Sequence, residues 1–388
     1  MLKKIMFHSF YQKYFADGLS RQMKELFWST AILDFAVSAV GIFEPIYLYT
    51  LGFSIQWIIL FFIAVYALYF FLAPLGGKIA RMHGYEHSIL YSTPFLILYY
   101  LSLFAIPYHP IFIGTAVVAL GLQKMLYWPG YHADFARFGA DGARGKEISN
   151  LIVLDSLVVV LGPVFGGIVI ATLGFKFLFV IVAALILFSN IPLLLTPEKF
   201  EPVPFSYKDA MKRLVKKENR RRLFAFIGFG EEHIAGYLWP IFIFLIIKEY
   251  FSVGLVVSAS VAVAIILTLY IGRISDGAAR REVLKIGVAF TFFTWFMRIL
   301  VVSGLGIFMM NSLYLISRRA MAVPFMAITY EDAKKTSVMQ SIIFLQMALV
   351  IGKILVSVLA LVALYFFPNS WLAIFILGAL MTLLYALL

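Results

Sequence analysis

Long apolar runs alternate with short polar breaks along almost the whole chain. A membrane-spanning helix needs roughly 20 mostly apolar residues, and twelve segments reach this length. They are 26–49, 56–79, 88–106, 111–133, 148–173, 177–195, 223–247, 253–274, 283–302, 306–328, 338–366 and 371–388. The pattern therefore predicts an all-α polytopic membrane protein with twelve transmembrane helices.

The composition is typical of the same class. Hydrophobic residues make up 63% of the 388 positions and charged residues 13%, and the mean hydropathy is +0.95. A soluble domain of this length cannot bury so much apolar surface. The chain has no cysteine, which excludes disulfides and cysteine metal sites, and we expect neither a metal nor a cofactor. Residues 1–25 are too mixed in polarity for a signal peptide, and we expect a cytoplasmic segment there.

Several features of the chain recur at an offset of 195 positions. The polar stretch 272–281 has a degenerate copy at 77–86, Pro45 recurs as Pro240, and Lys124 corresponds to Arg319. One offset that holds at separate places indicates an internal duplication. We therefore expect an N-terminal segment at 1–25, a six-helix bundle at 26–195, a basic linker at 196–222 and a second six-helix bundle at 223–388.

The basic residues predict how the chain is oriented in the membrane. If the N-terminus is cytoplasmic, 25 of the 32 basic residues lie on the cytoplasmic side, five lie within spans, and only Lys176 and Lys248 lie outside. Cytoplasmic loops carry an excess of Lys and Arg. We therefore expect a multi-pass protein of the cell membrane, plasma or inner, with both termini cytoplasmic. The net charge of +12 then reflects topology, and no nucleic-acid partner is expected.

The linker has a helix signal of its own. Ser206 and Asp209 have the spacing of a capping box, and basic residues surround a narrow apolar stripe after them. Such a helix can lie on an anionic inner leaflet. A solvated linker whose charges keep it inside explains the pattern equally well.

The two repeats, the basic linker and the polar loops resemble the major facilitator superfamily over essentially the whole chain. The family loop reads Gly-x-Leu-Ala-Asp-Arg-x-Gly-Arg-Arg. The second copy here keeps Gly272, Asp276, Arg280 and Arg281, and the first keeps Gly77 and Gly84 but has Arg81 at the aspartate position. The resemblance implies a gating role for these loops.

The two loops suggest different gate contacts. In the family fold, Asp276 would face the positive N-terminus of the helix at 148–173. Arg81 would face the start of the helix at 338–366, where Glu331 and Asp332 precede it. We hypothesise that Arg81 pairs with Glu331 or Asp332 and helps to close the cytoplasmic side. The alternative is an exposed loop arginine that serves topology alone, since surface pairs contribute little.

The fifth span contains a run of small residues, Gly162, Pro163, Gly166 and Gly167. It is similar to the glycine-proline motif of the family's antiporters. Small residues also permit ordinary close helix packing, and this interpretation is favoured. The resemblance therefore allows antiport without requiring it.

Charged residues within the spans carry the candidate chemistry, because a buried ionisable group usually faces a partner or a wet cavity. The resemblance implies that spans 1, 4, 7 and 10 line a central cavity, and all four are charged here. The candidate substrate-binding residues are Lys124, Trp128, Arg318, Arg319 and Lys353, and the candidate proton carriers are Asp34, Glu231 and Glu232. Structural pairing, for example of Asp34 with Lys124, is an equally weighted alternative. Glu44 is set aside because it lies near the outer end of its span, and Arg298 is interpreted as a packing or interfacial residue.

The resemblance implies a secondary active transporter that works by alternating access, and not an enzyme. No Gly-x-x-x-x-Gly-Lys-Ser/Thr loop is present, so direct ATP coupling is not expected. We expect proton coupling, a small organic anion as substrate, the lipid bilayer as surroundings and a monomer. One alternative is an exporter of lipophilic or cationic drugs. Another is a non-transporting receptor or lipid scramblase of the same fold.

Overall fold

The structure, a computed structural model, describes residues 21–138, 145–194, 202, 205–275, 280–334, 337–368 and 370–388. Within these ranges the chain is almost entirely helical and contains no β-strand. The first half contains α2 (Arg21–Gly41), α3 (Phe43–Thr50), α4 (Ile55–His83), α5 (Tyr85–Ala105), α6 (Ile111–Phe138), α7 (Gly145–Leu173), α8 (Phe175–Ser189) and the short η1 (Pro192–Leu194). Asp276 and the loop around it lie outside the described residues.

The second half repeats this arrangement after a short linker helix. It contains α9 (Tyr207–Val215), η2 (Lys217–Asn219), α10 (Arg220–Ile227), α11 (Gly230–His233), the π-helix η3 (Ile234–Leu238), α12 (Trp239–Ile247), α13 (Tyr250–Ser275), α14 (Arg280–Met297), η4 (Arg298–Leu300), α15 (Gly304–Lys334), α16 (Val338–Phe366), α17 (Trp371–Leu383) and η5 (Leu384–Leu387). Each predicted span coincides with one of these helices or with a continuous series of them. The predicted fold class is therefore confirmed.

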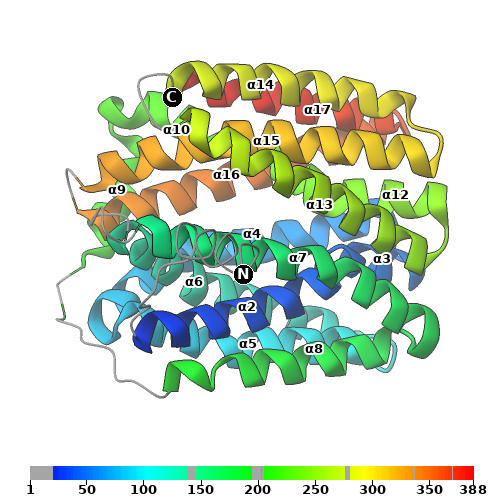
Figure 1. The fold of residues 1–388 in the computed structure, drawn as a ribbon, viewed down its shortest axis with the longest axis horizontal. Coiled ribbons are helices and arrows are strands. Elements are labelled where there is room, and N and C mark those ends of the chain that lie inside the picture. Colours follow the sequence, from blue (N-terminus) through cyan, green and yellow to red (C-terminus); the bar gives the residue numbers. More distant parts are fainter. Residues whose placement is uncertain are drawn as a thin grey trace, which may run out of the picture.

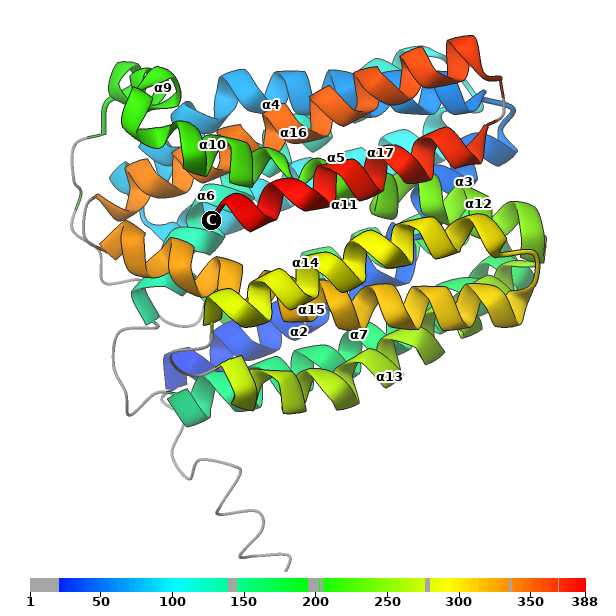
Figure 2. The ribbon, with the colours of Figure 1, turned by 90° about the horizontal axis from the view of Figure 1, so that it is seen from above.

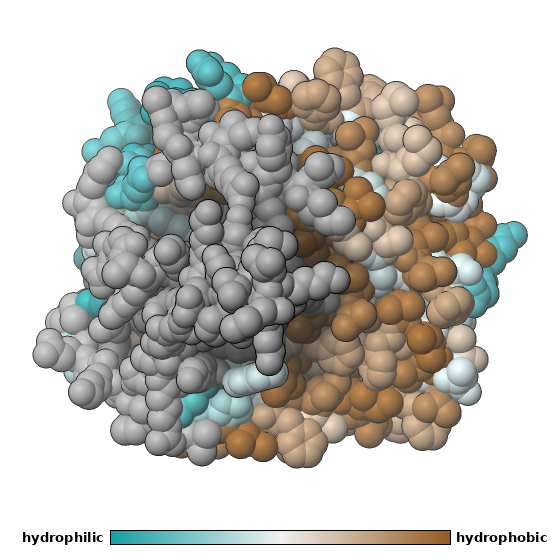
Figure 3. Space-filling model, in the orientation of Figure 1, coloured by the Kyte–Doolittle hydropathy of each residue, from teal (hydrophilic) through white to brown (hydrophobic). Residues whose placement is uncertain are grey.

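The surface of the bundle is apolar between its two ends. Seven helical stretches among the described residues are long and apolar enough to cross a membrane, and four shorter apolar helices accompany them. Apolar side chains cover most of the right part of the face in Figure 3, and hydrophilic side chains gather at the upper left and the right edge. Exposed Trp, Phe and Leu side chains are stable in contact with lipid, so this surface suits a bilayer.

The two halves lie side by side, with α2 to α8 below and α10 to α17 above in Figure 1. They meet along two seams, where α4 packs on α16 and α7 packs on α13. Figure 2 shows these two seams on opposite sides of the bundle. We call the end that carries α9 the linker end, and the end that carries α3 and α12 the distal end.

The small residues of α7 allow its close packing. A Cβ atom added at Gly162 or Gly166 would overlap α2 at Ser38 or Ala39, and one added at Gly167 would overlap the backbone of Tyr250. Pro163 takes part as well, because its carbonyl oxygen lies against Gly254 of α13. These residues therefore hold α7 against helices of both halves, as small residues do at membrane helix interfaces.

Two spans depart from regular α-helical hydrogen bonding along their length. The first has a one-residue turn at Ile42, between α2 and α3, where the backbone stays helical, and the seventh becomes a π-helix at 234–238. Gly41 and Gly236 lie at these irregularities, and neither has an atom within 4 Å of the position that a Cβ would take. The two glycines are separated by the same offset of 195 positions that relates the two repeats.

The linker helix α9 contacts both halves. Its first turn is capped by the Ser206 hydroxyl, which accepts a hydrogen bond from the Asp209 amide at 3.3 Å. The Tyr207 hydroxyl donates to the carbonyl of Phe71 on α4, and Arg213 donates to Ser341 on α16 at 3.2 Å. The helix therefore ties the two halves together at the linker end.

Candidate functional site: a charged central cavity

A cavity of about 860 Å³ lies between the two halves. The four predicted helices line it, namely α2, α6, α11 with α12, and α15, together with residues of α3, α4, α5, α13 and α16. Its charged lining residues are Asp34, Glu44, Lys124, Glu232, Arg318, Arg319 and Lys353. A cavity of this size and lining can hold a small polar solute.

A network of ion pairs crosses the cavity wall in the second half. The Arg318 Nε atom lies 2.9 Å from Glu231 Oε1, at ion-pair distance but without hydrogen-bond geometry, and its Nη2 atom pairs with Glu232. Lys353 Nζ lies 3.7 Å from the other oxygen of Glu232. The Tyr314 hydroxyl donates to Glu231 Oε2 at 2.8 Å. Glu231 is fully buried, whereas Glu232 is partly exposed to the cavity.

Two lysines from different halves approach one aromatic ring. The Nζ atom of Lys124 lies 5.4 Å from the centroid of the Tyr66 ring, and that of Lys353 lies 5.0 Å from it. Among the side chains that the structure describes, no carboxylate lies within ion-pair distance of Lys124. Tyr66 on α4 therefore joins the cation of the first repeat to that of the second through cation–π contacts.

Trp128 lines the cavity one turn beyond Lys124. Its ring stacks on His132 with 5.4 Å between centroids, and His132 Nδ1 lies 2.6 Å from the hydroxyl of Tyr330 on α15. This contact joins α6 to α15, the equivalent helices of the two repeats, on the linker side of Lys124. Trp128 is therefore held in place as part of the cavity wall.

Glu44 is a cavity residue that the sequence analysis set aside. It is only 8% exposed, and its oxygens accept hydrogen bonds from Tyr99 at 3.0 Å and Tyr100 at 2.8 Å. The expectation that it reaches water at the outer end of its span is wrong, because Tyr99 and Tyr100 of α5 pack against it. The repeat offered a signal, since Glu44 corresponds to Trp239, a second cavity residue.

Arg298 lies behind the cavity wall, fully buried. Its guanidinium lies between the rings of Trp239, Trp295 and Tyr314, at 4.1 to 4.2 Å from their centroids. None of its three nitrogens has a hydrogen-bond partner among the described residues. The packing interpretation of Arg298 agrees with this position, and ring faces stabilise the guanidinium while the charge of Glu231 acts on it from beyond ion-pair distance.

The structure brings most of the predicted site residues together. Lys124, Trp128, Lys353, Glu232, Asp34 and both arginines line the cavity, and Glu231 lies directly behind Glu232. Of the two arginines, Arg318 makes the ion pairs to Glu231 and Glu232, and Arg319 is the more exposed. Asp34 and Lys124 are not paired with each other.

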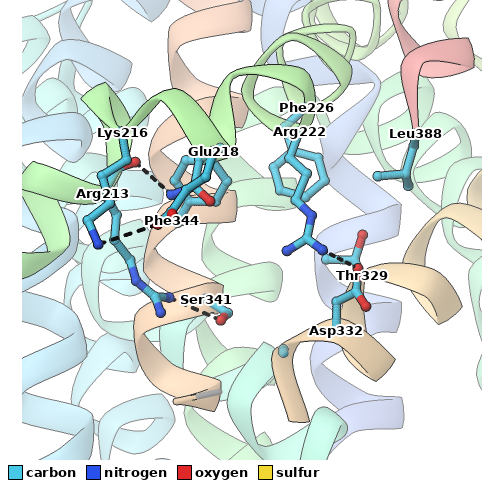
Figure 4. A pocket seen from close by; sticks show the side chains of 12 residues that line it. Arg213, Lys216, Glu218, Arg222, Phe226, Thr329, Asp332, Ser341, Phe344 and Leu388 are labelled. Carbon is cyan, nitrogen blue, oxygen red and sulfur yellow. Dashed lines mark hydrogen bonds and ion pairs between the residues drawn. The ribbon is translucent and has the colours of Figure 1, made fainter. Parts of the chain in front are cut away.

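The predicted gate contact of Arg81 does not form in this structure. Arg81 donates to the Tyr85 hydroxyl at 3.1 Å, within its own half. Asp332 instead pairs with Arg222 at 2.6 Å, because α10 brings Arg222 over the end of α15. Figure 4 shows this pair at a small pocket of about 150 Å³ at the linker end, beside Arg213 and Ser341. Glu331 is exposed.

The loop glycines have separate structural roles. A Cβ at Gly77 would overlap Ile343 of α16, so this glycine allows the α4–α16 seam. Gly84 has a φ of 110° and ends α4, a conformation that favours glycine. In the second copy, Arg281 is exposed at the start of α14. The Arg280 side chain is not described, and neither are the surroundings of Gly272.

Comparisons with known proteins agree with this architecture. No family model matches the chain. A "Multi-drug resistance efflux pump PmrA homolog" of Lactococcus lactis subsp. lactis (strain IL1403) is 25% identical over 238 residues. That match spans 57% of this chain and 57% of the relative. A POT family transporter, solved in complex with 5-aminolevulinic acid, aligns with a TM-score of 0.73 over 96% of both chains at 12% identity. The chain therefore shares the fold of this transporter over almost its whole length.

Proposed function

We propose that the protein is a secondary active transporter that moves a small organic anion by alternating access, coupled to protons. The observation that carries this proposal is the position of Lys124. This lysine lines a central cavity and has an aromatic ring, but no described carboxylate, within contact distance. A cation in such a place is costly without a counter-charge, and an anionic solute supplies one.

The neighbouring lysine extends the anion site across both halves. Lys353 shares the Tyr66 ring with Lys124, and its pair with Glu232 is long at 3.7 Å. A solute anion between the two lysines contacts α6 and α16 at once, so its binding stabilises one arrangement of the halves over another. The structural neighbour was solved with 5-aminolevulinic acid, whose carboxylate is consistent with such a site.

Proton coupling follows from the double role of Glu232. This carboxylate neutralises Lys353 and Arg318 together, and it is partly exposed to the cavity. Protonation of Glu232 removes its attraction for Lys353 and leaves that lysine available to the substrate. Glu231 stays paired with Arg318 and Tyr314 behind it, and Asp34 faces the same cavity from α2.

Counterflow in liposomes tests the proposal. Purified protein is reconstituted with an unlabelled organic anion inside, and uptake of the labelled anion is followed. Anions that raise the melting temperature are tried first, because a ligand of the folded state stabilises it by mass action. Exchange without a gradient, and accumulation under an inward proton gradient, are expected. Binding without any exchange would identify a receptor, and lipid redistribution in place of solute exchange would identify a scramblase.

A drug exporter is the second candidate. It is favoured by the match to the efflux pump homolog over 57% of the chain and by the aromatic lining around Glu44. The two functions differ in the charge of their ligand. If lipophilic cations raise the melting temperature of the protein and organic anions do not, the drug-exporter function replaces the anion proposal.

A further inference from the structure

Glu44 is held in a fixed orientation at the cavity wall. Both of its oxygens accept hydrogen bonds from adjacent tyrosines of α5, Tyr99 and Tyr100, at 3.0 and 2.8 Å. The side chain is 8% exposed and belongs to the cavity lining. A carboxylate has about four acceptor positions, so the two tyrosines orient Glu44 without saturating it.

No cation forms a direct ion pair with this carboxylate in the described part of the chain. None of the described Lys, Arg or His side chains lies within ion-pair distance of Glu44. Tyrosine hydroxyls compensate only part of the cost of burying a charge, because neutral donors are weaker than charged ones. The positive charge of Lys124 acts on Glu44 from beyond ion-pair distance, so the two opposite charges face the same cavity without forming a direct pair.

The cavity surface next to Glu44 also suits a cation. Tyr100 and Tyr237, which both interact with Glu44, line the same cavity. Aromatic faces attract alkylammonium groups by cation–π interaction. Glu44 and Lys124 come from different helices, α3 and α6, and face one cavity. A solute that carries both charges satisfies both of them at once.

We propose that Glu44, oriented by Tyr99 and Tyr100, binds an ammonium group of the substrate, so that the transported solute is a small amino-acid-like zwitterion. This inference rests on the proposed function, because Lys124 and Lys353 bind the anionic end. The alternative is that Glu44 binds only a proton, in which case the substrate needs no amine. The test below separates an ammonium site from a proton site.

Matched pairs of compounds provide the test. The melting temperature of the purified full chain is measured with β-alanine, 4-aminobutyrate and 5-aminovalerate, and with propionate, butyrate and valerate as their amine-free partners. For at least one of the three carbon-chain lengths, we expect the amino acid to bind more tightly than the amine-free acid of the same length. Glu44→Gln should weaken amino-acid binding about ten- to hundredfold, the range of a charge-assisted hydrogen bond, and leave the weaker binding of the partner acid unchanged.

A control and a second variant keep the test decisive. Glu249→Gln alters an exposed acid outside the cavity, between α12 and α13, and should retain the preference for the amine. If Glu44→Gln does not fold, Tyr100→Phe removes one of the two orienting hydrogen bonds and should reduce the preference severalfold.

The outcomes distinguish this inference from the proposed function. Equal binding of amino acids and partner acids, or a preference that survives Glu44→Gln, overturns the ammonium site and leaves the anion proposal standing. Binding of neither kind, together with absent counterflow of every organic anion, overturns both.

Discussion

Replacement of Arg318 by methionine should destabilise the protein strongly. Arg318 is the cationic partner of Glu231, whose side chain is fully buried, and it also neutralises Glu232. After the change, Glu232 keeps Lys353, and Glu231 keeps the hydroxyl of Tyr314 and the charge of Arg298, which acts from beyond ion-pair distance. The substitution therefore leaves one carboxylate in the interior without an ion pair.

The size of the effect follows from that charge. Removal of one partner from a buried ion pair costs about 3–5 kcal/mol. With an unfolding entropy of about 2.1 cal/mol/K per residue, the 388 residues correspond to about 0.8 kcal/mol per degree. Arg318→Met is therefore expected to lower the melting temperature by about 4–6 °C. Addition of Glu231→Gln should restore most of this loss, because it removes the carboxylate that Arg318→Met leaves without its ion pair.

Thermal unfolding of purified protein in detergent measures these differences, with all variants scanned at one rate because unfolding of large proteins is often irreversible. Arg319→Met is the matched control, since it removes the same charge one residue along the same helix from a more exposed side chain. Its effect should be smaller. The reasoning is refuted if Arg318→Met has the same melting temperature as the wild type. It is also refuted if addition of Glu231→Gln lowers the melting temperature of Arg318→Met further.

Three further predictions concern transport and orientation. Lys124→Ala should fold and bind the transported anion about ten- to hundredfold more weakly, measured by ligand-dependent melting; unchanged affinity would remove this lysine from the anion site. Glu232→Gln should abolish accumulation driven by a proton gradient but spare counterflow, and full gradient-driven uptake by this variant would exclude it as the proton carrier. In this cysteine-free chain, cysteines introduced at Lys176 and Lys248 should react with an impermeant reagent in intact cells, and protection of both would reverse the predicted topology.

The spans were predictable because a bilayer imposes a length and an apolar composition on each helix, and both can be read without tertiary contacts. The irregular turns were not. The turn at Ile42 and the π-helix at 234–238 depend on how α2, α11 and α12 pass the cavity. Regular helical spacing gives no warning of either irregularity.

The cavity helices were predictable only through the family resemblance, and their charges then followed from the sequence. The choice between Arg318 and Arg319 was not predictable, because adjacent residues differ by about 100° around a helix and the bundle axis was unknown. Glu44 was missed because its position near the end of a span was taken to mean that its side chain reaches water. The tyrosines that bury it, Tyr99 and Tyr100, come from a helix 55 residues further on.

The first and seventh spans are continuous helices that depart from regular α-helical hydrogen bonding at Gly41 and Gly236, which makes these two glycines the candidate joints of the spans. Beyond these points the short segments α3 and α12 pack on one another, so the distal parts of the two spans form a unit that crosses from one half to the other. A bend at the two glycines would swing this unit while α2 and α11 stay in place. Since Glu44 and Trp239 stand three residues beyond the two joints, the same swing would carry both side chains relative to Lys124. Opening of the distal end and release of a bound solute would then be one movement.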